Sequence, residues 1–304
     1  MTAALGRASA CGKLILCGEH FVVHGAPALA LPLTVVSTEV TVHEAPDADG
    51  PLLDSDAPDA LLDLAQRMVR TALDGLGLAP RTPWRIEARS SVPLGAGLGS
   101  SAAFSVALVG ALARAAGQRL AVEALNVRAH ALEGLVHGSP SGIDNTVIAH
   151  RRPIWFVKGA EPELLDGPGT LGLVLASSGA PRSTREAVAA VGVLRQAEPA
   201  RFASLCERAG ELTTRARAAF QAGDATALGA LMNENHELLR AINVSTEALD
   251  RLVVAARGAG ALGAKLTGGG RGGFVVALLP VGGEGRVSAA LKHAGATQLL
   301  RVMV

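Results

Sequence analysis

The feature that most constrains this chain is a glycine-rich loop between two apolar segments. The loop, PLGAGLGSSAA at residues 93–103, follows the strand-like run WRIEARSSV and leads into AAFSVALVGALARAAG, which is apolar on every side. Such a helix is buried, so core elements hold both ends of the loop. Glycines let backbone N–H groups approach an anion, and the helix N-terminus adds a positive dipole end. The segment predicts a phosphate-binding turn; a plain turn with Ser100 or Ser101 as helix cap is the alternative.

The loop differs from two well-known nucleotide motifs. A P-loop requires a lysine directly after its last glycine, and this loop has none there. The spacing of its glycines does not match GxGxxG either. A second glycine-rich segment, KLTGGGRGGFVVAL at residues 265–278, ends in a strand-like apolar run. Alone it favours a flexible turn. Together the two loops predict one site at which both halves of the chain contact a polyanion.

The first part of the chain is rich in predicted strands. The acidic segment HEAPDADGPLLDSDAPD is predicted to be a surface loop, because six acids and three prolines are unfavourable in a core. Apolar runs predict strands at residues 14–16, 35–42 and 84–88. Helices are predicted at residues 59–77 and 121–137.

The second part is mostly helical. After a strand near PIWFVKG and another at LGLVLASS, helical stretches run between about 183 and 259, and the chain ends strand, helix, strand. Glycine, proline and acidic residues cluster near residues 158–170. We therefore predict an N-terminal domain at 1–160 and a C-terminal domain at 170–304.

Composition excludes several classes of partner. Lys and Arg number 28 against 27 Asp and Glu, and a net charge of +1 provides no field for nucleic acid or anionic lipid. The three cysteines form no CxxC pair, which favours a reducing compartment. The longest uncharged tract, residues 90–113, is interrupted by proline and glycines, and no signal peptide is recognised. We expect a cytoplasmic protein without nucleic-acid or membrane partners.

Few ionisable residues stand out as candidates for chemistry. Glu133 lies in an apolar context, where an unpaired carboxylate would be costly to desolvate, so a cation partner is one reading and a solvent-facing glutamate the other. Asp144 follows a Pro-Ser-Gly turn, where Asp often caps the chain. The histidines form no HExxH, so zinc is not expected. The remaining candidates are Lys13, Glu19, His20, Arg182 and Arg185.

Three segments in order resemble a known superfamily. GKLILCGEHFVVHG, PLGAGLGSSAA and KLTGGGRGG are similar to the three signature segments of the small-molecule kinases named for galactokinase, homoserine kinase, mevalonate kinase and phosphomevalonate kinase, the GHMP kinases. GEHFVVHG, HGSPSGIDN and NENHELLRAINVSTEALDRL resemble the mevalonate kinase family in particular. The resemblance spans nearly the whole chain.

The resemblance implies roles for individual residues. Asp144 matches the aspartate that takes the proton of the substrate hydroxyl, and Lys13 matches the lysine beside it. Ser101, with Ser100 as a further contributor, and Glu133 fall at the magnesium site. Contacts to mevalonate are implied for Glu19, His20, Arg182 and Thr184. The ATP phosphates are expected on Gly95, Ala96, Gly97, Leu98, Gly99, Ser100 and Ser101.

The fold implied is α/β (α+β), with an N-terminal α/β nucleotide-binding domain and a ferredoxin-like C-terminal α/β domain. The implied activity is phosphorylation of the 5-hydroxyl of mevalonate, with ATP and Mg²⁺. A homodimer is compatible with the resemblance. The alternatives are a sister kinase acting on phosphomevalonate, another mevalonate hydroxyl, homoserine or a sugar, and a catalytically silent nucleotide-binding regulator.

The chain departs from the family pattern at four places. Cys11 replaces the usual proline, Cys17 stands where an aromatic residue or histidine is common, and Phe274 replaces a cysteine. Arg271 replaces a glycine in the last motif, where it could reach a phosphate or point to solvent. None of these changes removes a predicted catalytic group.

Overall fold

The computed structural model describes residues 4–169, 171–180 and 184–304, without the side chains of residues 184 and 185. The chain divides into two compact units. Unit 1 consists of residues 1–13, 36–93 and 99–151, and unit 2 of residues 14–35, 94–98 and 152–304. Each unit is therefore assembled from several chain segments. The domain boundaries placed at 160 and 170 remain a prediction.

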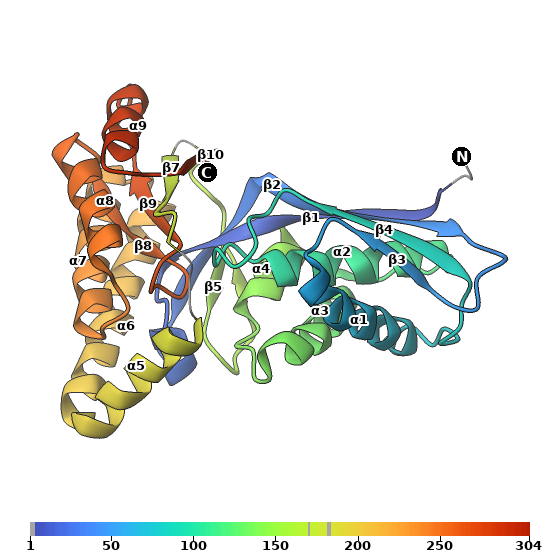
Figure 1. The fold of residues 1–304 in the computed structure, drawn as a ribbon. Helices are drawn as coiled ribbons and strands as arrows, with labels where there is room; N and C mark the ends of the chain where they lie inside the picture. Colours follow the sequence, from blue (N-terminus) through green and yellow to red (C-terminus); the bar gives the residue numbers. More distant parts are fainter. Residues whose placement is uncertain (1–3, 170, 181–183) are drawn as a thin grey trace. The chain divides into compact units, whose positions relative to one another are not determined.

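Unit 1 contains a sheet built around the second half of a long strand (Figure 1). Residues 38–44 of β2 pair antiparallel with β4, and β3 pairs in parallel with β4. The acidic segment was predicted to be entirely loop, which is wrong, because β3 lies within it. Leu53 of β3 pairs with Ile86, so a short apolar stretch extends the sheet despite the surrounding acids. The strands are β1 (Ala4–Cys17), β2 (Ala28–Glu44), β3 (Leu52–Ser55) and β4 (Trp84–Ser90).

Four helices of unit 1 pack together, with α2 in contact with the other three and with β4. The prediction that α2 is a buried helix is confirmed, since most of its residues are shielded from solvent. Gly6 of β1 permits a close approach, because a Cβ there would lie 2.4 Å from the carbonyl oxygen of Ala111 in α2. The four α-helices are α1 (Leu62–Gly75), α2 (Ser100–Ala115), α3 (Val122–His137) and α4 (Ile143–His150), and the short 3-10 helix η2 (Asp59–Leu61) precedes α1.

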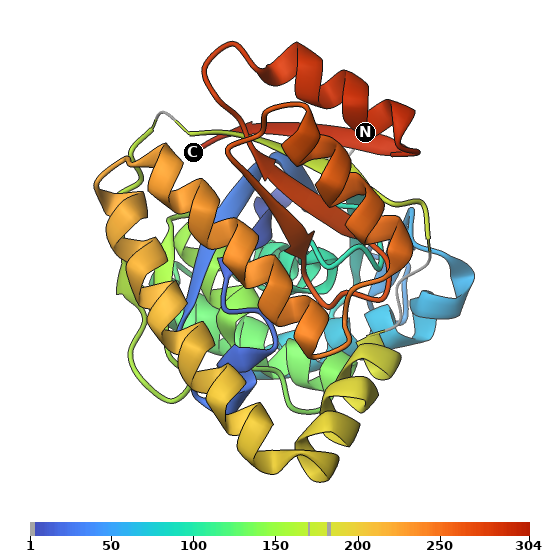
Figure 2. The ribbon, with the colours of Figure 1, turned by 90° about the vertical axis from the view of Figure 1, so that its left-hand side faces the viewer.

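Unit 2 contains a sheet in the order β10-β7-β9-β8, and all of its pairs are antiparallel. Helices α7, α8 and α9 contact this sheet and α6 packs against α7 (Figure 2). A Cβ on Gly263 of β8 would lie 2.1 Å from the carbonyl oxygen of Gly229, so two glycines allow α7 to lie close to β8. The strands are β7 (Gly172–Ser177), β8 (Gly263–Thr267), β9 (Phe274–Leu278) and β10 (Gln298–Met303).

The rest of unit 2 includes the first half of β2, which pairs antiparallel with β5 through residues 28–30. β5 in turn pairs with β6. The predicted helical stretch between 183 and 259 is divided into four helices. The remaining elements of unit 2 are η1 (Phe21–His24), β5 (Ile154–Phe156), β6 (Glu163–Leu164), α5 (Thr184–Ala197), α6 (Pro199–Gln221), α7 (Ala225–Ala241), α8 (Glu247–Gly258) and α9 (Glu284–His293). Across the described ranges, no helix combines the length and hydropathy needed to cross a membrane.

Candidate active site

Unit 1 brings Lys13 and Asp144 together as an ion pair. Lys13 lies on β1, and Asp144 lies in the first turn of α4, after Gly142 in a left-handed conformation at the N-cap. The Nζ of Lys13 is 2.9 Å from Oδ1 of Asp144. The lysine side chain is 5% exposed and the aspartate side chain 32% exposed, so the carboxylate keeps an open side. A buried lysine and a carboxylate that is open to solvent can together bind a hydroxyl group, and the carboxylate can accept the hydroxyl proton.

Glu133 lies beside this pair and is buried, which excludes the solvent-facing reading. Its two carboxylate oxygens accept hydrogen bonds from the hydroxyls of Ser101 and Ser105 on α2, each at 3.1 Å. His137, one turn later on α3, places Nε2 3.6 Å from Oε2 of Glu133. Burial and, after it, the negative charge of Asp144 raise the pKa of Glu133 to about 7, although both serines and Lys13 act in the opposite direction.

The chemistry of these donors fits Mg²⁺. Ser101 and Glu133 provide hard oxygen atoms, and Mg²⁺ commonly takes one or two carboxylates together with water and substrate phosphates. Burial and the nearby charge of Asp144 raise the pKa of Glu133, and a bound cation would favour its charged form. Within the described part of the chain, no cluster of three or more His, Cys, Asp or Glu side chains is arranged to hold a metal. A site with few protein ligands is therefore the one that this donor set can form.

The first glycine loop has the backbone conformation that only glycine adopts easily. Gly95, Gly97 and Gly99 have φ values of 66°, 78° and 81°. A Cβ on Gly99 would lie 2.7 Å from Cγ of Lys13, so the loop also needs glycine for packing against the lysine stem. The alternative of a serine cap is wrong, because Gly99 is the N-cap of α2 and Ser101 turns its hydroxyl to Glu133.

Unit 2 holds a second group of predicted site residues around His20. His20 has a φ of 62°, unusual for a residue other than glycine, and its Nε2 donates to the carbonyl oxygen of Gly269 at 3.0 Å. This bond assigns a proton to Nε2. Gly268, in the same glycine loop, would place a Cβ 3.1 Å from the carbonyl oxygen of Gly97. The two glycine-rich loops singled out in the sequence therefore meet within unit 2.

Glu19 is engaged on both carboxylate oxygens. Oε1 pairs with the ammonium group of Lys265, and Oε2 accepts from Nδ2 of Asn235 at 3.2 Å. Glu19 and Lys265 are both buried, at 1% and 0% side-chain exposure. Burial also raises the pKa of the neighbouring Cys17 thiol to about 12, so Cys17 is no nucleophile. The group is a closed polar network inside unit 2.

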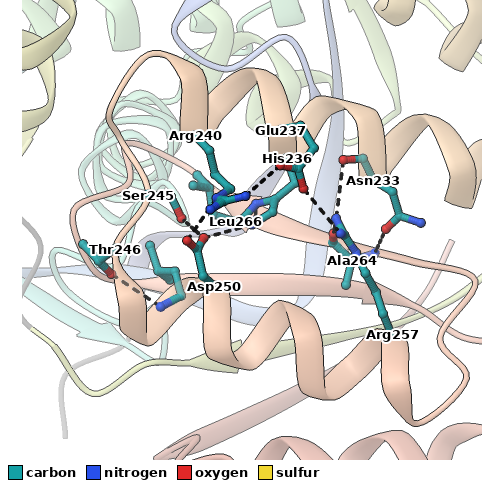
Figure 3. Close-up of polar contacts among 11 residues, drawn as sticks. Asn233, His236, Glu237, Arg240, Ser245, Thr246, Asp250, Arg257, Ala264 and Leu266 are labelled. Atoms are coloured by element: carbon teal, nitrogen blue, oxygen red, sulfur yellow. Dashed lines mark hydrogen bonds and ion pairs between the residues drawn. The ribbon is translucent and has the colours of Figure 1, made fainter.

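Side chains of α7 satisfy backbone amides at the free edge of β8 (Figure 3). β8 is an edge strand, and two side chains one turn apart on α7 satisfy its amides: Asn233 Oδ1 accepts from Ala264 N–H at 3.0 Å, and His236 Nδ1 accepts from Leu266 N–H at 3.3 Å. Lys265 lies between these anchors. Burial lowers the pKa of His236 to about 4, which keeps its ring neutral and able to accept.

Sequence reasoning missed Lys265, Asn235 and Ser105 as members of these clusters. The one available signal was a lone lysine in the otherwise apolar and glycine-rich run GAKLTGGG. Of the other predicted residues, Arg182 lies outside the described part of the chain. Thr184 begins α5, and its side chain, like that of Arg185, is also outside it.

The fold is that of a family of small-molecule kinases. The model for the GHMP kinases N terminal domain matches residues 63–151, and the model for the GHMP kinases C terminal matches residues 216–296. The chain belongs to the GHMP kinases, and its two-domain fold with mixed helices and sheets is the fold of that family.

Within that family, the chain is similar to mevalonate kinases. It is 36% identical to the mevalonate kinase of Pyrococcus abyssi over 96% of this chain and 94% of that protein, and 33% identical to that of Aeropyrum pernix over 91% and 89%. The crystal structure of L. major mevalonate kinase in complex with R-mevalonate superposes with a TM-score of 0.86 at 31% identity, covering 99% and 98% of the two chains.

Proposed function

We propose that the protein transfers the γ-phosphoryl group of ATP to the 5-hydroxyl of mevalonate, forming mevalonate 5-phosphate and ADP. Its similarity to mevalonate kinases over nearly the whole chain supports the substrate. Membership of the GHMP kinases supports ATP as the phosphoryl donor. The observation in this chain that carries the proposal is the Lys13–Asp144 pair, because it joins an accessible carboxylate to a fixed positive charge.

The proposed chemistry needs one proton acceptor and several positioned charges. The hydroxyl oxygen of mevalonate forms a bond to the γ-phosphorus while the bond from that phosphorus to the bridging oxygen of ADP breaks. Asp144 accepts the hydroxyl proton, and the ammonium group of Lys13 stabilises the charge that develops on the transferred group. Phosphoryl transfer depends mainly on such positioning. The pair is well fixed, since Lys13 is almost fully buried.

Ser101 and Glu133 would hold the magnesium ion. When bound there, Mg²⁺ would neutralise negative charge on the ATP phosphates. The protein's own contribution is to keep Oε2 of Glu133 and the hydroxyl of Ser101 beside each other, as their 3.1 Å hydrogen bond does. The backbone of residues 95–101 is proposed to surround the phosphates, which its three left-handed glycines allow.

Of the four residues predicted to contact mevalonate, His20 and Glu19 have side chains that the structure describes. His20 is supported by a fixed ring orientation, because its Nε2 donates to Gly269. Glu19 gives both oxygens to Lys265 and Asn235, so we assign it the task of fixing the segment that carries His20. Arg182 and Thr184 stay predictions. A cytoplasmic location, a homodimer and the absence of nucleic-acid and membrane partners also stay predictions.

The direct test is ADP release by the full chain with mevalonate, mevalonate 5-phosphate, homoserine and galactose, each with and without Mg²⁺. We expect turnover with mevalonate and Mg²⁺ and little with the other alcohols. Turnover with another alcohol alone would support a sister kinase. Nucleotide binding without turnover on any of them would support the silent regulator and contradict the proposal.

A further inference from the structure

A cavity of about 830 Å³ lies in unit 2 beside Arg271 of the second glycine loop. Its walls come from α5, the end of α7, the following turn and the start of α8. Arg271, the arginine that replaces a glycine in the last family motif, lines it. The sequence left the role of Arg271 open between a phosphate contact and a solvent-facing side chain. The cavity gives this residue a defined surrounding.

The acidic groups in the cavity wall are already compensated (Figure 3). Oδ2 of Asp250 accepts from Nε of Arg240 at 3.1 Å, and Oε2 of Glu237 accepts from the same guanidinium at 2.9 Å. Arg257 adds a second positive charge 3.6 Å from Glu237. Oδ1 of Asp250 also accepts from the hydroxyl of Ser245. Two carboxylates and two guanidinium groups thus balance one another.

Arg271 differs from Arg240, the other arginine that lines this cavity, because Arg240 pairs with Glu237 and Asp250. Within the described ranges Arg271 makes no ion pair, and its Nε is buried without a hydrogen-bond acceptor. Buried donors are normally satisfied, so an orphaned guanidinium nitrogen calls for an explanation. The backbone is fixed at this point, because the N–H of Arg271 donates to the carbonyl oxygen of Val244 at 2.7 Å with φ at 54°. The side chain therefore starts from a fixed position on the cavity wall.

Part of the cavity wall is apolar. Ala190 and Val193 of α5 line the cavity together with Ala241, and Val193 is 67% exposed although it is a large aliphatic residue. A ligand that matches both kinds of lining carries an anionic group for Arg271 and a short apolar body for Val193. A guanidinium group matches carboxylate and phosphate oxygens particularly well.

We propose that this cavity binds a small amphiphilic anion through Arg271, namely a phosphate monoester or a carboxylic acid with a short aliphatic chain. The residues that line this cavity belong to unit 2, whereas Lys13 and Asp144 belong to unit 1. The cavity is connected along the chain to Gly269, the acceptor of the His20 hydrogen bond, two residues before Arg271. The proposal does not depend on which alcohol the enzyme phosphorylates.

The test uses butyl phosphate as the probe, with the full chain saturated by a non-hydrolysable ATP analogue so that the phosphate loop is occupied. We expect saturable one-to-one binding in calorimetry, in the millimolar range or tighter, and weaker binding of inorganic phosphate, which lacks the apolar body. Arg271→Gly should weaken butyl phosphate binding about tenfold or more, because it removes a charged hydrogen-bond donor. Glycine suits the φ of this position, so this variant should fold normally.

The matched control is Arg251→Gln, which removes a positive charge from an exposed arginine of α8 that does not line the cavity. It should leave the affinity unchanged. Equal affinity of wild type and Arg271→Gly, equal losses in both variants, full displacement of the probe by the nucleotide analogue, or no saturable binding would each overturn the proposal. Because binding is measured without turnover, failure here is distinct from failure of the proposed kinase activity.

Discussion

The two units contain the same chemical pair, a lysine beside a carboxylate, in opposite environments. In unit 1, Lys13 meets an aspartate that is 32% exposed. In unit 2, Lys265 meets Glu19, and neither side chain is more than 1% exposed. The first pair is open on the side of the carboxylate, whereas the second is closed by Asn235. Burial thus separates a pair suited to chemistry from a pair suited to structure.

The difference has a physical basis in what each carboxylate can still do. Asp144 can accept a further hydrogen bond from an incoming hydroxyl, since one side is open to solvent. Glu19 is already bonded to Lys265 and Asn235, and its side chain is only 1% exposed, so an incoming hydroxyl has no open side to approach. A buried ion pair is also costly to break, because the remaining charge stays in a medium that solvates it poorly. Substitutions should therefore damage folding in unit 2 and turnover in unit 1.

The largest expected effect on stability is that of Lys265→Met. It leaves the Glu19 carboxylate buried without its cation, and we expect the free energy of unfolding to fall by about 3–5 kcal/mol in urea titrations. The double variant Glu19→Gln/Lys265→Met should lose less than the single variant. Lys292→Met, at an exposed lysine of α9, is the control and should stay within about 0.5 kcal/mol of wild type. A loss in Lys265→Met no larger than in the control would break the comparison.

His236 should make the stability of unit 2 depend on pH. Burial lowers the pKa of His236 to about 4 from its usual 6.5, so the unfolded chain binds the proton more readily. The stabilisation is present above pH 6.5 and is lost as pH falls towards 4, by on the order of 3 kcal/mol. His236→Gln should remove this part of the slope, and His293→Gln, at an exposed position, should not. Parallel pH profiles of wild type and His236→Gln would contradict the assignment.

Gly99→Ala should have a smaller effect on stability, together with a loss of turnover, because Gly99 packs against the lysine of the open pair. The new Cβ would lie 2.7 Å from Cγ of Lys13 and force the lysine to move, in addition to the strain of a φ of 81°. Gly117→Ala is the matched control, because Gly117 has a φ of 70° and nothing within 4 Å of a built Cβ. We expect about 1–2 kcal/mol of destabilisation in both variants and lower turnover only in Gly99→Ala. Equal turnover in the two variants would show that the position of Lys13 does not matter.

Local pattern was enough to predict most elements and the open cluster. The helix expected at about 121–137 is α3 at Val122–His137, and the glycine loop leads into a buried helix as its apolar composition indicated. The closed cluster was missed for a physical reason. Lys265 and Glu19 are 246 positions apart, and no local periodicity records which distant side chain compensates a buried charge. The same holds for Asn233 and His236, whose function is to satisfy the edge of another element.

The acidic segment shows the opposite failure. Its charges predicted a loop, but four residues form β3 and pair in parallel with β4. Arg85 and Arg89 of β4 donate to the Asp54 carboxylate, so cross-strand pairing makes a charged strand tolerable. Composition alone does not contain this pairing.

The central claim is that the open pair does the chemistry, and Asp144→Asn tests it most directly. Turnover and thermal stability of this variant should be measured together with Asp166→Asn, an exposed aspartate of unit 2, as control. The account predicts a fall in turnover of at least ~100-fold with retained ATP binding and a nearly unchanged melting temperature. Near-normal turnover in Asp144→Asn, or a loss explained by unfolding, would contradict it.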